Sequence, residues 1–166
     1  KSMSIRIIVT GGTFDKRYDE IEGTLTFQET HLPVILRQVR VTVPVHVETN
    51  QLIDSLHMTM QDRLRILEAC RQAPESLLII THGTDTIVET AQLLGEAQLA
   101  KTIVLTGAMV PYTVFGSDSL FNLGGSVTAV QLLAHGVYVV MNGRIFDWDN
   151  IRKNRQRGTF EALDAE

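Results

Sequence analysis

The sequence predicts a single-domain, three-layer α/β fold with an open, mainly parallel twisted sheet of the Rossmann or flavodoxin type. Short apolar, β-branched runs alternate with stretches of helical periodicity, which is the pattern of βαβ units. Three of the apolar runs are almost continuous, as expected for strands that helices cover on both faces. A length of 166 residues fits one domain, 1–166.

Five strands are expected along the chain. They lie at residues 5–9, 39–47, 77–80, 102–105 and 137–141. Pro44 interrupts the second strand, and proline within a sheet favours an edge strand or a strand end.

Four helices are expected between these strands, at residues 31–38, 59–71, 86–94 and 118–133. The second has the clearest beginning, because Thr59-x-x-Asp62 resembles a capping box with Asp in the place of Glu or Gln. Leu64, Leu67 and Arg71 follow at helical spacing. The pattern at 31–38 is the weakest of the four.

Composition excludes several classes of function. The formal net charge of −4 argues against nucleic-acid binding, for which a basic face supplies most of the affinity. No apolar run is long enough to span a bilayer, and no signal-peptide pattern precedes the first strand. The only cysteine, Cys70, allows no internal disulfide. We therefore expect a soluble cytoplasmic protein with no nucleic-acid or membrane partner.

Glycine and hydroxyl-bearing residues follow four of the five strands. In an open parallel sheet, the carboxyl ends of the strands form the ligand crevice. These segments are therefore expected to meet at one edge of the sheet. They occupy residues 10–13, 81–86, 106–108 and 142–144.

Taken alone, the first two segments have ordinary explanations. Residues 10–13 read Thr-Gly-Gly-Thr, which suits a tight turn as well as a ligand loop. Neither a dinucleotide fingerprint nor a phosphate loop is present, so a flavodoxin-like nucleotide binder is disfavoured. Thr84 or Asp85 can cap the following helix, or the same helix start can face a ligand carboxylate or an oxyanion.

Taken together, the segments hold what amide hydrolysis needs: a nucleophile, a base and donors for an oxyanion. Thr13 and Thr84 can supply hydroxyls, and the glycine turns can supply backbone N–H groups. Lys153, after the fifth strand, can serve as the base. A lysine base needs a pKa lowered toward about 7–8, and burial and a nearby carboxylate act in opposite directions, so the sequence leaves this balance open.

The motifs resemble those of the bacterial-type L-asparaginases in order and approximate spacing, over essentially the whole chain. They are the segments 10–13, 82–86 and 106–111, followed by Ser117-Asp118 and Asn122. The combination is specific, although each motif alone is not. The resemblance implies hydrolysis of L-asparagine to L-aspartate and ammonia through a threonine acyl-enzyme, without a metal or organic cofactor. It leaves room for weak hydrolysis of L-glutamine.

The resemblance also implies catalytic roles. Thr13 corresponds to the attacking threonine, and Tyr18, in the loop that follows, to the lid tyrosine that helps to activate it. Thr84, Asp85 and Lys153 correspond to a second triad. In that triad Thr84 positions or attacks, and Lys153 acts on its proton. Asp85 binds the α-amino group of the substrate or orients the lysine.

The expected substrate-binding residues lie beside this triad. Ser55 resembles the serine that binds the substrate α-carboxylate, while Gly12 and Gly83 line the site with Thr84 and Asp85. The neighbouring residues 56 and 57, Leu and His, depart from the polar or acidic residues of longer relatives.

The length is the largest departure from the family. Typical members are about twice as long and carry a smaller C-terminal domain, so the chain resembles a short form that lacks this domain. The family is built from intimate dimers, which implies a homodimer or a homotetramer here.

Other conspicuous residues have structural explanations. None of the five histidines has metal-ligand spacing, so no metal site is expected, and His82 is expected to form structural hydrogen bonds. Cys70 suits a buried apolar position and Trp148 suits packing. The basic run 152–157 is expected to be a solvated face, with the exception of Lys153.

A second class of function stays open. The same glycine turns and hydroxyls suit a non-catalytic module that binds aspartate or asparagine-like ligands. The presence of Thr13, Thr84, Asp85 and Lys153 together favours the enzyme, because a pure binder has little need for a lysine beside a threonine.

Overall fold

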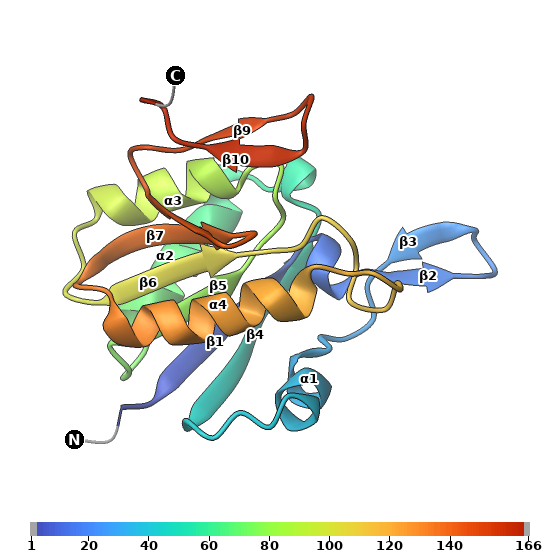
Figure 1. Ribbon diagram of the computed structural model, residues 1–166, viewed down its shortest axis with the longest axis horizontal. Helices are drawn as coiled ribbons and strands as arrows, with labels where there is room; N and C mark the ends of the chain where they lie inside the picture. The colour runs from blue at the N-terminus through green and yellow to red at the C-terminus, as the bar shows by residue number, and fades with distance from the viewer. Residues whose placement is uncertain (1–2, 165–166) are drawn as a thin grey trace.

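The computed structural model of the chain describes residues 3–164 and has a six-stranded sheet at its centre (Figure 1). The strand order is β4-β1-β5-β6-β7-β8. The first five strands are parallel and β8 runs antiparallel to β7, so the expected mainly parallel sheet is confirmed. The strands are β1 (Ile5–Gly11), β4 (Val45–Ile53), β5 (Leu77–Thr81), β6 (Thr102–Thr106), β7 (Gly136–Met141) and β8 (Arg144–Asp147).

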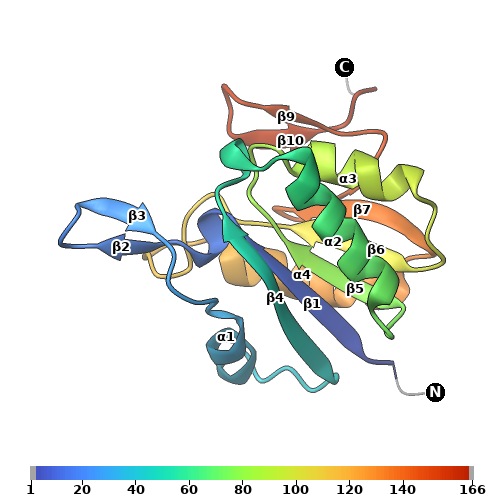
Figure 2. The same ribbon diagram turned by 180° about the vertical axis from the view of Figure 1, so that it is seen from behind.

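Helices cover both faces of this sheet and complete the three layers (Figures 1 and 2). One face packs against α1 (Leu32–Gln38) and α4 (Ser119–Leu132). The other packs against α2 (Met60–Gln72) and α3 (Ile87–Glu96). No helix in the described part of the chain is long and apolar enough to cross a membrane.

The four expected helices are confirmed, and their ends agree with the sequence pattern to within two residues. The capping box before α2 is present in both directions. The Asp62 N–H donates to Thr59 Oγ1 at 3.3 Å, and the Thr59 N–H donates to Asp62 Oδ2 at 2.8 Å. An aspartate therefore completes the box, although its side chain is shorter than that of the usual glutamate.

The position of the second strand was wrong. We expected residues 39–47, whereas β4 begins at Val45 and ends at Ile53. Residues 39–44 form the connection from α1, in which Arg40 has a φ of 59° and the Pro44 carbonyl accepts a hydrogen bond from the Ile5 N–H. β4 is an edge strand with partly exposed faces, so its polar second half did not look like a strand.

Several short elements have no apolar pattern and were not expected. Two are hairpins, β2 (Arg17–Asp19) with β3 (Thr24–Thr26) and β9 (Arg152–Asn154) with β10 (Thr159–Glu161). Two are 3₁₀ turns, η1 (Thr13–Asp15) and η2 (Ser55–His57).

The segment 142–144, expected as a rim loop, is also the turn between β7 and β8. Asn142 and Gly143 have φ values of 50° and 86°, the left-handed geometry that Asn-Gly provides in tight hairpins. Asn142-Gly143 was therefore a sequence signal for a hairpin. The strand prediction relied on apolar runs and missed β8.

The strand order fixes where a ligand crevice can form. From β1 the chain passes to β4 on one side of β1, and then crosses to β5 on the other side. The carboxyl ends of β1 and β5 therefore flank the point at which the strand order reverses, which is where open α/β sheets bind ligands. The loops 10–13 and 81–86 both begin there.

Trp148 packs against α3, as expected, and its partner Gly95 leaves no room for a side chain. A Cβ at position 95 would lie 2.1 Å from Trp148 Cδ2. We expect Gly95→Ala to destabilise the protein by about 1–3 kcal/mol, because the overpacked ring must move. Thermal unfolding followed by circular dichroism measures this as a lower Tm.

Gly124→Ala is the matched control, since Gly124 is also helical but a Cβ there meets nothing within 4 Å. Alanine should there raise stability by up to about 1 kcal/mol through helix propensity. Equal Tm values for the two variants would contradict the packing role of Gly95.

Candidate active site

The candidate site lies where the loops after β1 and β5 meet. Gly12 has a φ of 78°, and a Cβ at this position would lie 2.4 Å from the Gly83 N atom. A Cβ at Gly83 would lie 2.5 Å from Ser55 Oγ. A side chain at position 12 or 83 would therefore overlap these neighbouring atoms, and glycine is needed at both positions. Gly83 thus lies against both Gly12 and Ser55, the other two predicted binding residues.

Thr84, Asp85 and Lys153 come together at the same edge of the sheet. Lys153 Nζ donates to Thr84 Oγ1 and to Asp85 Oδ1, both at 3.0 Å. Thr84 is 7% exposed and the Lys153 side chain 12%, so the contact between the lysine and the hydroxyl is shielded from bulk solvent. Lys153 lies on β9 opposite Phe160, whose buried ring fixes the hairpin to the core.

The capping explanation of Thr84 and Asp85 does not hold. α3 begins after Thr86, and no side chain in the described residues caps its first turn. The Thr84 hydroxyl and the Asp85 carboxylate bind Lys153 instead. Both side chains therefore belong to the cluster around Lys153 and not to the cap of the helix.

Arg155 is a site residue that the sequence interpretation missed. Its Nη1 lies 3.3 Å from Asp85 Oδ1 and its Nη2 donates to the Asp85 carbonyl at 3.2 Å. The basic run 152–157 was expected to be a solvated face apart from Lys153; Arg155 is indeed 63% exposed, but its contact with Asp85 was not expected. The turn between β9 and β10 brings the guanidinium back over Asp85, and no sequence pattern signals that turn.

Ser55 lies at the start of η2, and Thr86 fixes its position. The Thr86 N–H donates to Ser55 Oγ at 3.2 Å and the Thr86 hydroxyl donates to the Ser55 carbonyl at 2.9 Å. The preceding Asp54 accepts hydrogen bonds from Lys16 Nζ at 2.6 Å and from the Leu56 N–H at 3.0 Å. The hydrogen bond from Lys16 is the main cause that lowers the pKa of Asp54. The Ser55 segment is thereby tied to the loop after β1.

Thr13 begins η1, directly after Gly12. Within residues 3–164 no hydrogen bond engages its side-chain hydroxyl. The same turn is anchored by Asp15, which is buried and accepts hydrogen bonds from the His31 N–H at 2.8 Å and the Thr30 hydroxyl at 2.9 Å. Burial, the largest effect, raises the pKa of Asp15 despite these bonds. The turn thus holds a free hydroxyl on a fixed backbone.

The structure does not bring Tyr18 to Thr13. Tyr18 lies on the β2–β3 hairpin, pairs with Leu25 and is 59% exposed. The hairpin projects from the body of the protein (Figure 1). No hydrogen bond in the described range 3–164 joins the Tyr18 hydroxyl to another side chain. Its catalytic role stays a prediction.

A polar network supports the third loop, residues 106–110. Asp118 accepts hydrogen bonds from the N–H groups of Met109 and Val110 and from Asn142 Nδ2, each at 3.0 Å. Asn122 Nδ2 donates to the Gly107 carbonyl at 2.9 Å. Burial alone would raise the pKa of Asp118, but these hydrogen bonds lower it below its ordinary value. The motif residues Asp118 and Asn122 thus fix a loop.

His82 has the structural role that was expected. It is fully buried, with Nδ1 2.8 Å from the Gly83 carbonyl and Nε2 2.7 Å from Thr90 Oγ1. A carbonyl only accepts, so Nδ1 carries the proton and Nε2 accepts from the threonine hydroxyl. Burial lowers the pKa of His82 from 6.5 to about 4. The neutral His82 ring therefore fixes the position of the Gly83 carbonyl through a hydrogen bond.

This shift predicts a pH dependence of stability. The pKa of His82 is lower in the folded than in the unfolded protein, so unfolding takes up a proton once the pH falls below about 6.5. The stabilisation is complete above that pH and is lost as the pH falls toward about 4. We expect the Tm to fall across this window, and His82→Gln to flatten the fall.

His46→Gln provides the control, since His46 is exposed on β4 and should leave the wild-type slope unchanged. A wild-type Tm that is constant from pH 6.5 to 4, measured by differential scanning calorimetry, would contradict the effect of burial on the pKa of His82.

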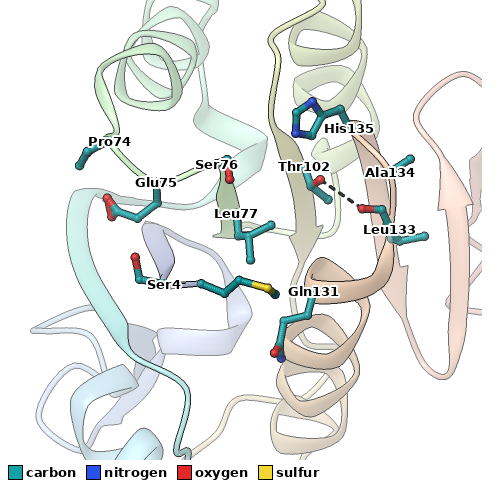
Figure 3. A pocket seen from close by; sticks show the side chains of 11 residues that line it. Ser4, Pro74, Glu75, Ser76, Leu77, Thr102, Gln131, Leu133, Ala134 and His135 are labelled. Atoms are coloured by element: carbon teal, nitrogen blue, oxygen red, sulfur yellow. Dashed lines mark hydrogen bonds between the residues drawn. The ribbon is translucent and has the colours of Figure 1, made fainter. Parts of the chain in front are cut away.

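The described residues contain no cluster suited to a metal ion, and a separate pocket lies away from the candidate site. Among residues 3–164 no group of three or more His, Cys, Asp or Glu side chains could hold a metal ion. A pocket of about 770 Å³ opens beside Ser76, Thr102 and His135 (Figure 3). These residues lie at the amino ends of β5, β6 and β7, the opposite edge of the sheet. The pocket is therefore not part of the candidate site.

The chain is similar to a family of known proteins over almost its whole length. The family described as "Asparaginase, N-terminal" matches residues 4–165. The chain belongs to this family. L-asparaginase 1 of Escherichia coli K12 is 28% identical over 170 residues, which span 96% of this chain and 50% of the relative. The chain thus spans about half the length of the curated asparaginases that it matches.

Solved asparaginase structures share the fold. The thermostable L-asparaginase from Thermococcus kodakarensis superposes with a TM-score of 0.85 at 26% identity, over 99% of this chain and 52% of that one. A probable cytoplasmic L-asparaginase from Campylobacter jejuni gives 0.80 at 30% identity, over 96% and 53%. The fold and the family expected from the motifs are confirmed.

Proposed function

We propose that this protein hydrolyses the side-chain amide of L-asparagine to L-aspartate and ammonia through a threonine acyl-enzyme. One observation carries the proposal: Lys153 Nζ lies 3.0 Å from the Thr84 hydroxyl in a largely buried site. A basic group within hydrogen-bond reach of a hydroxyl is the arrangement that activates a nucleophile. Membership of the asparaginase N-terminal family supports the same reaction.

In the first step the enzyme forms an ester with the substrate and releases ammonia. A threonine hydroxyl attacks the amide carbon, with Thr13 as the attacking residue and Thr84 as the positioning or alternative nucleophile. Lys153, in its neutral form, accepts the proton of the Thr84 hydroxyl, which in turn accepts the proton of Thr13 when Thr13 attacks, and Lys153 then gives a proton to the departing ammonia. The C–N bond breaks as the ester C–O bond forms. Tyr18 would assist Thr13 after a movement of its hairpin.

The second step returns the free enzyme. Water attacks the ester, the threonine regains its proton, and aspartate leaves. Oxyanion donors are needed in both steps. The Gly12 N–H is unavailable, because it donates to the Ile53 carbonyl at 3.0 Å. The N–H groups of Thr13 and Thr84 have no acceptor within residues 3–164, so we assign them this role.

Substrate binding is assigned to residues around the triad. Ser55 would hold the α-carboxylate, Asp85 would face the α-amino group, and Gly12 and Gly83 would allow the substrate to approach the backbone. L-Glutamine has one methylene more than L-asparagine, which a site discriminates by only about 1–3 kcal/mol. Weak glutaminase activity is therefore part of the proposal.

The proposal extends to assembly and location. Residues 1–166 would act as one asparaginase N-terminal-like domain, in a homodimer or homotetramer and in the cytoplasm. Sedimentation that shows a fully active monomer would contradict the assembly.

Hydroxylamine tests the acyl-enzyme. L-Asparagine is incubated with the protein, in the presence of a chelator, at rising hydroxylamine concentration, and ammonia, aspartate and β-aspartohydroxamate are measured. We expect hydroxamate to replace aspartate, since both arise from one intermediate. Ammonia release without any hydroxamate would argue for direct attack by water and against the threonine ester.

A further inference from the structure

Two cations share the one carboxylate beside Thr84. Asp85 Oδ1 lies 3.0 Å from Lys153 Nζ and 3.3 Å from Arg155 Nη1. Arg155 Nη2 also donates to the Asp85 carbonyl at 3.2 Å, so the guanidinium contacts both ends of the residue. The exposed fractions rise outward, from 12% for the Lys153 side chain to 33% for Asp85 and 63% for Arg155. Arg155 therefore covers Asp85 from the solvent side.

This arrangement sets the charge that an incoming substrate meets. The Asp85 carboxylate is already engaged by Lys153 and by Arg155, so it is not free to accept a further cation while Arg155 stays in place. The neighbouring Lys16–Asp54 pair is closed at 2.6 Å and adds no net charge. A substrate ammonium group at Asp85 must displace Arg155 and approach Lys153. A substrate that lacks the α-ammonium group leaves the Asp85–Arg155 pair intact.

We propose that Arg155 is a specificity-determining residue that shifts the site toward carboxylate-bearing amides without a free α-ammonium group. The proposal rests on the amidohydrolase function proposed above and names its substrate class. Succinamate is the simplest member, since it differs from L-asparagine only by hydrogen in place of the α-ammonium group. The reaction is unchanged: the amide C–N bond breaks, water supplies the new C–O bond, and ammonia leaves.

The test compares two substrates in three proteins. Ammonia release gives kcat/KM for L-asparagine and for succinamate with the wild type, Arg155→Gln and Arg157→Gln. We expect Arg155→Gln to raise the asparagine-to-succinamate ratio of kcat/KM by about two- to fivefold, because an exposed charge pair has an effect of this order. Both substrates carry the same carboxylate, so the change in the ratio comes from the α-ammonium group of L-asparagine, which no longer has to displace Arg155 from Asp85.

Arg157→Gln is the matched control. Arg157 lies in the same turn and is exposed, and its side chain makes no hydrogen bond to Asp85 in the described structure. The variant removes the same charge and should change the ratio by less than twofold. An unchanged ratio in Arg155→Gln, or an equal shift in both variants, would overturn the proposal.

A binding measurement separates this proposal from the proposed function. Calorimetry gives Kd values for succinate and L-aspartate with the same three proteins. If no ammonia is released from either substrate, the amidohydrolase proposal fails, and the binding ratio alone decides the role of Arg155. Tighter binding of aspartate relative to succinate in Arg155→Gln supports the role. Equal ratios, or no binding of either ligand to the wild type, overturn it.

Discussion

Lys153→Met is expected to lower kcat for L-asparagine by about 10²- to 10⁴-fold, the usual contribution of one general acid–base group. Lys153 Nζ is the only nitrogen of a basic side chain within hydrogen-bond distance of Thr84 Oγ1 in the described structure. Methionine keeps most of the volume of the lysine stem, so the β9–β10 hairpin should stay in place. The measurement is steady-state ammonia release at saturating substrate.

Two companion variants separate proton transfer from charge and from folding. Lys153→Arg keeps the charge but offers no group that can act as a base, so it should lose activity like Lys153→Met. Arg152→Met changes the neighbouring residue of β9, whose exposed side chain pairs with Glu161 at 2.7 Å, and should retain near wild-type turnover. Lys153→Met with turnover within tenfold of wild type would contradict a catalytic lysine.

Gly12→Ala is expected to reduce kcat/KM by roughly a hundredfold, because the two loops of the site must separate. The new Cβ would lie 2.4 Å from Gly83 N and 2.5 Å from Gly83 Cα, and backbone atoms cannot move aside as a flexible side chain can. A displacement of about 1 Å at a catalytic group can cost a factor of this size. Ammonia release and thermal unfolding are measured together.

Gly23→Ala is the control for an alanine at positive φ that has no neighbour to clash with. Gly23 has a φ of 68°, close to the 78° of Gly12, but a Cβ there meets nothing within 4 Å. Both variants place alanine at a positive φ, and Gly12, with a ψ of 179°, also lies in a region essentially restricted to glycine, which adds a strain of about 1–3 kcal/mol. Only Gly12→Ala should lose activity. Equal kcat/KM values in the two variants would show that the contact between Gly12 and Gly83 is not needed for catalysis.

The sequence predicted the centre of the sheet and the edge that carries the site. β1, β5, β6 and β7 are short apolar runs with both faces covered, which is a pattern that a single sequence displays clearly. The polar segments after β1 and β5 are adjacent because parallel strands end at one edge. The association of Thr84 with Lys153 followed from the family resemblance rather than from spacing.

The remaining features depend on contacts that leave no local pattern. β4 is polar because it is an edge strand, and its register is set by pairing with β1. Arg155 is exposed like its neighbours in the turn, so the sequence did not show that its guanidinium contacts Asp85. Thr84 and Asp85 fit helix capping equally well until the position of Lys153 is known. Tertiary contacts decide each of these cases.

The most direct test of the central claim is ammonia release from L-asparagine by the purified chain, beside Thr13→Ala and Thr84→Val. Valine has the shape of threonine without its hydroxyl, so a loss in Thr84→Val reports chemistry rather than packing. We predict turnover in the wild type and a fall of at least about a hundredfold in both folded variants. A folded wild type that binds aspartate without releasing ammonia, or variants that keep wild-type turnover, would contradict a threonine amidohydrolase.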